Sequence, residues 1–149
     1  MRPMIITTRL ATVADIETIR DLTIQYHREF GSGPGPHDIP APEGPQGMFN
    51  VLLAEQDGEV LGMLALQRVH NLSAGTRYLL LSDIFVPPRG RRHGVARELM
   101  RAVRDLAPTL HCQGMSLVVS QVNIPALTTA ARAGFTSHDL LLFTYSEDG

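Results

Sequence analysis

The chain has 149 residues, of which 44% are apolar and 19% are charged, and its mean hydropathy is close to zero. A chain of this length typically forms a single domain, so one domain is expected over residues 1–149. The composition excludes a disordered or fibrous protein. No apolar run approaches the ~18 residues of a membrane span, and the first residues do not resemble a signal peptide. A cytoplasmic protein is therefore expected. A lone cysteine, Cys112, excludes a disulfide scaffold and a zinc domain, so no metal is expected.

Positive charge is unevenly distributed along the chain. All 13 basic residues are arginines, and 15 acidic residues bring the net charge to −2. Residues 89–104 hold six of the arginines and one acid, Glu98, which gives this segment a charge of +5 and leaves −7 for the rest. Such a concentration favours an anionic partner, although a solvated helix face would look the same. Nucleic acid is disfavoured as that partner by the overall acidity.

The N-terminal third predicts a strand, a helix and a long loop. A short apolar run over Met4–Arg9 suits a first strand, and Thr12 followed by Asp15 has the pattern of a helix cap. Apolar residues at three-to-four spacing then predict a helix that reaches Phe30 with one buried stripe, formed by Ile16, Ile19, Leu22, Tyr26 and Phe30. Gly31–Gly47 contains five prolines and must be a loop, either covering a binding site or present as a tolerated insertion.

The middle of the chain predicts a hairpin and a central strand. Asp57-Gly58 is a strong turn signal between two β-compatible runs, Asn50–Gln56 and Glu59–Val69. After a polar break, Arg77–Val86 is dense in Leu, Ile, Phe and Val. This composition predicts a central strand buried on both faces and ended by two prolines.

The C-terminal part predicts two helices that alternate with strands. Gly94–Ala107 has one apolar helical face, and Met115–Gln121 has the composition of a strand that follows it. A βαβ crossover to a parallel or splayed strand is therefore expected. Asn123 caps a further helix through Ala133, and Leu140–Tyr145 is expected to form a last strand. The fold class predicted from these elements is α+β with a mixed sheet.

The chemistry concentrates where the central strand meets the arginine-rich helix. The small residues Gly94 and Ala96 let a ligand approach the backbone, and the first N–H groups of a helix are unpaired at its positive end. This arrangement predicts a cradle for a phosphate or diphosphate. The segment contains neither a P-loop nor the G-x-G-x-x-G pattern, which disfavours nucleoside triphosphates and dinucleotides.

Two motifs occur in this region in a fixed order. The first has the form V-x-P…Q/R-x-x-G-x-G/A and is carried by Val86, Pro88, Arg91, Gly94 and Ala96. The second has the form N-x-x-A-x-x-L-Y-x-K-x-G-F and is matched in part by Asn123, Ala126, Arg132, Gly134 and Phe135. Together they resemble the acetyl-CoA motifs of the GCN5-related N-acetyltransferases, the GNAT family. The order of predicted elements along the rest of the chain is similar to that family's order.

The resemblance implies an α/β/α layered fold. Its mixed, mostly antiparallel sheet would have about six to seven strands, splayed between the two central strands and flanked by about four helices. It also implies that acetyl-CoA is the cosubstrate. The backbone of Phe85 and Val86 would pair with the pantetheine arm, and Asn123 would hold the pantetheine or adenosine end or only cap its helix. The diphosphate would lie on the amides of Arg91, Arg92, His93, Gly94, Val95 and Ala96. Arg89, Arg92 and Arg97 would add charge.

The chain departs from the second motif at Ala130, where the family often has a tyrosine that protonates the leaving thiolate. The candidates for catalysis are Asp83 and Ser82 on the central strand, where similar family members often carry acids near the substrate amine. The alternative for Asp83 is a structural salt bridge with Arg68 or Arg77. The weaker candidates for the base are His70, Ser120 and Tyr145, and Cys112 is a poor nucleophile because direct transfer needs none.

The expected function is acetyl transfer to a primary amine of a small molecule, an amino acid or a protein. A coenzyme A-binding sensor without catalysis is the second hypothesis, and a nucleic-acid-binding domain is a distant third. The expected partner is an amine-bearing small-molecule or peptide acceptor, with no nucleic acid and no membrane, and a homodimer is an assembly that the resemblance allows. Asp38 and Glu43 in the long loop, with His37, would shape acceptor selectivity.

Overall fold

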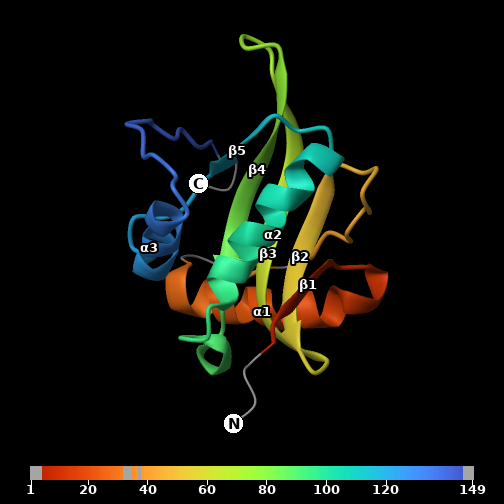
Figure 1. Ribbon diagram of the computed structural model, residues 1–149. Coiled ribbons are helices and arrows are strands. Elements are labelled where there is room, and N and C mark those ends of the chain that lie inside the picture. The colour runs from red at the N-terminus through yellow and green to blue at the C-terminus, as the bar shows by residue number, and fades with distance from the viewer. Residues whose placement is uncertain (1–4, 32–34, 37, 146–149) are drawn as a thin grey trace.

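The computed structural model describes residues 5–31, 35, 36 and 38–145. Its sheet has the strand order β1-β2-β3-β4-β5, and only the last pair is parallel. The strands are β1 (Thr7–Leu10), β2 (Phe49–Gln56), β3 (Glu59–Asn71), β4 (Thr76–Phe85) and β5 (Gly114–Leu117). The helices are α1 (Ile16–Phe30), α2 (Val95–Thr109) and α3 (Ile124–Arg132), with short 3₁₀ turns at Val13–Asp15 (η1) and Pro88–Gly90 (η2). Figure 1 shows this arrangement.

The sheet separates two hydrophobic clusters. Successive residues of a strand point to opposite faces, and in β2 Leu52 joins the cluster that packs against α2, whereas Leu53 joins the cluster that packs against α1. The two helices therefore cover opposite faces of the sheet, as Figure 1 shows. Ala126 of α3 belongs to the α2 cluster, which places α3 on the same side as α2. The α/β/α layering implied by the sequence is confirmed.

The β2–β3 hairpin confirms the turn predicted from Asp57-Gly58. Both residues have positive φ angles, 51° and 82°, which is the conformation that a two-residue type I′ turn requires. The strands that flank it extend slightly beyond the predicted bounds, to Phe49 and Asn71.

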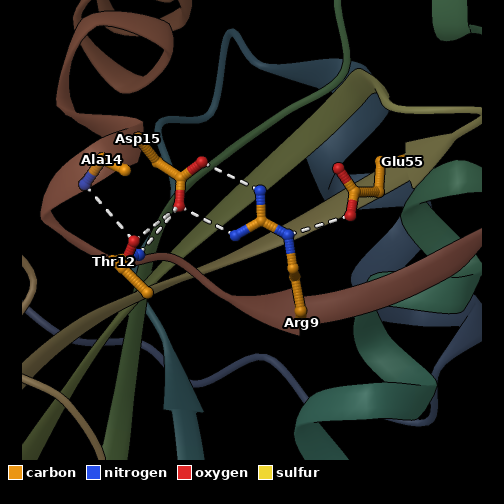
Figure 2. Close-up of polar contacts among 5 residues, drawn as sticks. All are labelled: Arg9, Thr12, Ala14, Asp15 and Glu55. Carbon is orange, nitrogen blue, oxygen red and sulfur yellow. Dashed lines mark hydrogen bonds and ion pairs between the residues drawn. The ribbon is translucent and has the colours of Figure 1, made fainter.

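The beginning of α1 is fixed by a polar network that also reaches β1 and β2 (Figure 2). The backbone N–H of Thr12 donates to the carboxylate of Asp15 at 2.8 Å, and the Thr12 hydroxyl accepts from the N–H of Ala14 at 3.3 Å. Arg9 of β1 donates to Asp15 at 2.8 and 2.9 Å and to Glu55 of β2 at 2.9 Å. The predicted cap is confirmed, and it begins a 3₁₀ turn that runs directly into α1.

Two glycines bring η2 and α2 close to β3. A Cβ on Gly62 would lie 2.7 Å from Cγ1 of Val95, and a Cβ on Gly90 would lie 2.5 Å from the carbonyl oxygen of Leu61. Neither position has room for a side chain. The glycines therefore set how closely the N-terminal end of α2 lies to the sheet.

Strands β4 and β5 part from each other before β4 ends. They pair only from Tyr78–Gly114 to Leu81–Leu117, whereas β4 continues to Phe85 against β3. The end of β4 is therefore unpaired on its β5 side, and the splay predicted between the central strands is present.

The described part of the chain has five strands and three α-helices, fewer than the six to seven strands and four helices expected. The strand predicted over Met115–Gln121 ends at Leu117, where β5 parts from its partner. Leu140–Tyr145 does not form a strand, because its side chains lie in solvent and no described strand pairs with it. The apolar pattern of this segment indicates β propensity, but a strand also needs a partner.

Two smaller expectations also differ from the structure. The central strand is buried on both faces along only part of its length, since Tyr78 and Leu80 are half-buried and Asp83 is exposed. Helix α2 includes Pro108 in its last turn rather than ending before it. The first strand begins at Thr7, and Met4, its expected start, lies outside the described residues.

Candidate functional site

A cleft of about 900 Å³ lies between α2, α3 and the end of β4. All nine residues that the sequence predicts for the acetyl-CoA site line it: Phe85, Val86, Arg91, Arg92, His93, Gly94, Val95, Ala96 and Asn123. The sequence assigns them to three separate elements. The structure brings them to one surface.

The loop before α2 presents backbone N–H groups to the cleft. Gly94 is the N-cap of α2 with a left-handed φ of 78°, and Arg92 is also left-handed at 66°. The first bond of the helix runs from the N–H of Glu98 to the carbonyl of Gly94 at 3.0 Å, so the amides before Glu98 have no partner in the helix. Turns of this kind followed by a helix N-terminus attract anions.

Arg91 holds this loop in place through its side chain. Its Nε donates to the carbonyl of Val86 at 2.9 Å, and its guanidinium forms an ion pair with Glu29 of α1. The same group lies over the Phe85 ring, 5.9 Å from its centroid. Arg91 therefore connects the loop, the end of β4 and the opposite helix, and its charge is already partly balanced by Glu29.

Asn123 is both a helix cap and a lining residue of the cleft. It is 2% exposed, and its side-chain oxygen accepts the N–H of Ala126 at 3.2 Å, which caps α3. Its Nδ2 is buried and makes no hydrogen bond of ordinary distance and angle among the described residues, although the Tyr26 phenol is a close polar neighbour. A buried unpaired donor is costly, so this amide group is suited to a ligand acceptor in the cleft that Asn123 lines.

Asp83 and Ser82 lie on the splayed part of β4 but do not line this cleft. Asp83 belongs to a β-bulge, because Ser82 pairs with Ala65 while Phe85 pairs with Met63, and its φ is 49°. Bulges of this kind are frequent beside active sites, where they redirect a side chain. Asp83 is exposed as a residue, but neighbouring protein atoms displace part of the water around its carboxyl group and so raise its pKa. A hydrogen bond with Ser82 opposes this shift.

The alternative for Asp83, a structural salt bridge with Arg68 or Arg77, is not found in the structure. No ion pair joins Asp83 to an arginine within the described ranges. Arg68 instead donates to the carbonyl of Pro45 in the long loop. The bulge removes Asp83 from the regular alternation on which that expectation depended.

Tyr26 of α1 is a residue that the sequence places only in the core stripe. It is half-buried, and its ring packs edge-on against Phe85 with centroids 5.7 Å apart. Burial raises the pKa of its phenol, the nearby Asp83 carboxylate raises it further, and the Asn123 amide opposes the shift. Tyr26 therefore lies between the splayed strand and the cleft. Its spacing in α1 matches the apolar stripe and gives no separate signal.

The remaining candidates lie away from the cleft. His70 lines a second, smaller cavity together with Cys112, the Ser120 hydroxyl accepts the N–H of Val122 at 3.3 Å, and Tyr145 is 88% exposed. Burial raises the pKa of the Cys112 thiol, which disfavours the reactive thiolate. Ala130 does not line the cleft, whereas its neighbour Thr129 does.

The described part of the long loop lies on the α1 side of the sheet. Ile39 packs in the cluster that contains Tyr26 and Phe30, and the buried side chain of Asn50 exchanges two hydrogen bonds with the backbone of Gly44, at 2.7 and 2.9 Å. Asp38 and Glu43 are placed in the loop, where Asp38 is exposed, and His37 lies outside the described residues. The last part of the loop is therefore attached to β2.

A family model described as "Acetyltransferase (GNAT) family" matches residues 16–135. The chain belongs to this family. A streptothricin acetyltransferase from Streptomyces lavendulae is 35% identical over 79 residues, which are 53% of this chain and 40% of that protein. The match thus spans well under half of the length of that curated relative.

Solved GNAT structures share the fold of this chain. A ribosomal-protein-alanine N-acetyltransferase from Brucella melitensis biovar Abortus 2308 has a TM-score of 0.79 at 16% identity, covering 95% of this chain and 99% of that one. The aminoglycoside N-acetyltransferase AAC(6')-Iy, in complex with CoA, has a TM-score of 0.73 at 20% identity, covering 98% and 97%. A probable acetyltransferase has the same TM-score at 22% identity, covering 94% and 97%.

Two kinds of feature are absent from the described residues. None of the helices in the ranges given above is both long and apolar enough to cross a membrane. The described His, Cys, Asp and Glu side chains form no group of three that could hold a metal ion.

Proposed function

We propose that this chain transfers the acetyl group of acetyl-CoA to a primary amine of a small molecule, an amino acid or a protein. One observation carries the proposal: residues from two separate sequence motifs of the family line a single cleft beside the splayed strands. A cytoplasmic location, expected from the sequence, belongs to the same proposal.

The residues of the cleft fit acetyl-CoA. The unpaired amides from Arg92 to Arg97 suit the diphosphate, whereas the N–H of Arg91 already donates to the carbonyl of Pro88 at 3.3 Å. The free edge at Phe85, the last residue of β4, and at Val86, which follows it, suits the amide groups of the pantetheine arm. The carbonyl of Val86 is already engaged by Arg91, so the free backbone groups of this edge are the remaining partners. The orphaned Nδ2 of Asn123 provides a donor deeper in the cleft.

Direct transfer requires a neutral amine and a stabilised leaving thiolate. Asp83 is assigned as the base: it takes a proton from the amine, directly or through water, while the amine nitrogen forms the new C–N bond and the C–S bond breaks. The raised pKa of its carboxyl brings it closer to that of an amine than an ordinary aspartate would be. Ser82, which bonds Asp83, orients the carboxylate.

The departing thiolate then needs a proton. Ala130 provides none, and the phenol of Tyr26, beside both Asp83 and Asn123, is the O–H group that we assign to this step. The Tyr26 phenolate regains a proton from the Asp83 carboxyl, which carries the one removed from the amine. Each cycle thus ends with both side chains in their starting state.

The names of the similar proteins support an amine as the acceptor that we propose. The names of the similar proteins include acetyltransferases of streptothricin, of aminoglycosides and of ribosomal-protein alanine. We take from them the amine nucleophile, and Asp83 favours a cationic amine at the splayed strands. Such an amine releases one proton to water before the attack, and Asp83 takes the second proton during it. A coenzyme A-binding sensor is the second candidate, because Ala130 replaces the tyrosine of the second motif.

Release of free thiol from acetyl-CoA, measured across a panel of amines and peptides, tests the proposal. Turnover with at least one amine is expected. Saturable acetyl-CoA binding with no turnover on any acceptor would favour the sensor, and absence of binding would overturn both functions.

The variant Gly94→Val tests the cradle itself. Its side chain would mask the amides, so at least a ~10-fold loss of acetyl-CoA affinity, or ~1.4 kcal/mol, is expected by calorimetry. Gly58→Val is the matched control, because the φ angle of Gly58 is 82° and that of Gly94 is 78°. Gly58 lies in the β2–β3 turn, where an added Cβ would meet no atom within 4 Å. Equal affinities in the two variants would contradict the cradle.

A further inference from the structure

The walls of the cleft carry more arginine than the cradle needs. Arg97, Arg101 and Arg104 follow one face of α2 at intervals of four and three residues, and Arg132 of α3 faces the same cleft. Among the described residues, only Arg101 of these four has an acidic partner, Glu98 at 3.3 Å. Arg97, Arg104 and Arg132 thus have no acidic partner in the described part of the chain, although they lie beside a site where backbone amides would bind the diphosphate.

Arg97 belongs to the cradle. Its Nη2 would lie 3.5 Å from a Cβ on Gly94, so the guanidinium is directly over the N-cap of α2. This position places its charge beside the amides that would hold the diphosphate. The unpaired charge of Arg97 is therefore explained by the diphosphate that the cradle would hold.

The other three, which we term the outer arginines, lie further along the cleft: Arg101, Arg104 and Arg132. On a helix that rises 1.5 Å per residue, Arg101 and Arg104 are about 6 and 10 Å beyond Arg97. Arg104 donates to the carbonyl of Ala133 at 3.0 Å, which joins α2 to the residue directly after Arg132. The cations of two helices are thus brought to one end of the cleft.

A solvated helix face is a poor account of this arrangement. Charges on such a face are usually interspersed with acids at three-to-four spacing. Arg101 has such a partner in Glu98, but Arg104 and Arg132 have none among the described residues, and the three arginines converge from two helices on a concave surface. Arginine guanidinium groups are suited to a phosphate monoester, because their fixed forks match its oxygens and it carries close to two negative charges at pH 7.

We propose that the outer arginines bind the phosphate monoester on the ribose of coenzyme A, its 3′-phosphate, and so select this cosubstrate against dephospho-CoA. The inference rests on the proposed function. With the diphosphate on the amides before Glu98, only the ribose ring separates the cradle from the second phosphate. Arg101 and Arg104, one to two helical turns along α2 from Arg97, and Arg132 on α3 beside the same cleft are placed to receive it.

Calorimetry with two ligands on each variant tests the proposal. The ligands are acetyl-CoA and acetyl-dephospho-CoA, which differ only in the 3′-phosphate. The wild-type chain should bind acetyl-CoA about 10-fold tighter or more, the size expected for charge-assisted hydrogen bonds to one phosphate. Arg132→Gln should reduce this ratio several-fold with the affinity for acetyl-dephospho-CoA nearly unchanged.

Two further variants make the test independent of folding and of net charge. Arg101→Gln should also lower the ratio, and its weak exposed pair with Glu98 makes misfolding an inadequate explanation for a change. Arg20→Gln on α1 removes the same charge away from the cleft and should leave the ratio at the wild-type value.

Each result decides the proposal. Equal binding of the two ligands by the wild-type chain, or equal losses for both in Arg132→Gln, would overturn the 3′-phosphate site while leaving the acetyltransferase function intact. Absence of binding for both ligands would overturn the proposed function, and this inference with it. A loss in Arg20→Gln equal to that in Arg132→Gln would show a general charge effect and also overturn the site.

Inorganic phosphate at constant ionic strength separates the two sources of a phosphate group. Competition that weakens acetyl-CoA but not acetyl-dephospho-CoA is expected if the cosubstrate's own phosphate occupies the outer arginines. Tighter binding of acetyl-CoA in the presence of phosphate would show that the arginines hold a separate ion, which contradicts the proposal.

Discussion

Asp83 has a left-handed backbone conformation at the point where β4 loses its partner β5. Aspartate tolerates this region better than most residues, but the conformation is still uncommon outside glycine. Strain of this kind persists where the surrounding structure fixes it, and it is concentrated at functional sites. The bulge, the splay and the raised pKa of the carboxyl thus occur at one residue.

Asp83→Asn is expected to lower turnover on the preferred amine by ~10²–10⁴, the usual contribution of a general base, with acetyl-CoA affinity nearly unchanged. In the wild-type chain kcat/KM should rise with pH through the Asp83 pKa, which is raised above its ordinary value because neighbouring protein atoms displace water from the carboxyl group. The variant should lose this rising limb. Tyr26→Phe should lower kcat but keep the rising limb of the pH profile, so the two variants distinguish the acid from the base.

The same substitution has an opposite expectation for stability. Because the folded pKa is raised, the favourable contribution of Asp83 is present at low pH and is lost as pH rises through that pKa. Asp83→Asn should therefore melt at the same or a higher Tm at pH 8. A lower Tm together with normal turnover would show that the residue is structural, and the base must then be sought elsewhere.

At the scale of elements, the sequence predicted the placement of the residues around Gly94 better than the placement of Asp83 and Tyr26. The cradle depends on one continuous segment, from Val86 to Ala96, in which a strand end, a turn and a helix start are all local signals. The position of Asp83 depends on a bulge opposite β3, and the place of Tyr26 depends on how α1 crosses the sheet. Neither relation is encoded by spacing within one element.

The close packing of α2 on β3 is expected to control the cradle. Gly62→Ala places a Cβ 2.7 Å from Cγ1 of Val95, so the first turn of α2 must move outward. A loss of ~1–3 kcal/mol of stability and weaker acetyl-CoA binding are expected from this overpacking. Adding Val95→Ala removes the clash and should recover part of the affinity, measured as a coupling between the two changes.

Gly114→Ala is the control for that experiment. Gly114 begins β5, and a Cβ there meets no atom within 4 Å. Its affinity for acetyl-CoA should equal that of the wild-type chain. If Gly62→Ala also bound acetyl-CoA normally while losing stability, the position of the helix would not control the cradle.

At the scale of the whole molecule, the largest difference between sequence and structure is the segment Leu140–Tyr145. Its four consecutive apolar residues are 81–86% exposed, and the outer side of β5 pairs with no described strand. Alternation and composition report whether a segment suits a strand, but pairing also depends on the length of the edge that it meets. Strand β5 offers only four residues, Gly114–Leu117.

The polar network of Figure 2 is expected to set part of the acid stability of the whole fold, because Arg9 joins β1 to the start of α1 and to β2. Its hydrogen bonds lower the pKa of Asp15 from 3.8 to about 2, so the stabilisation is complete above about pH 4 and is lost as pH falls to about 2.

Asp15→Asn keeps an acceptor for Thr12 but removes the charge. Urea unfolding at pH 7 should show a loss of about 1–2 kcal/mol, reduced by solvent at the half-exposed Arg9, and most of this loss should disappear at pH 2. Asp21→Asn, exposed on α1, is the control and should change neither value. A loss for Asp15→Asn that persisted at pH 2 would show that the charge of Asp15 is not its source.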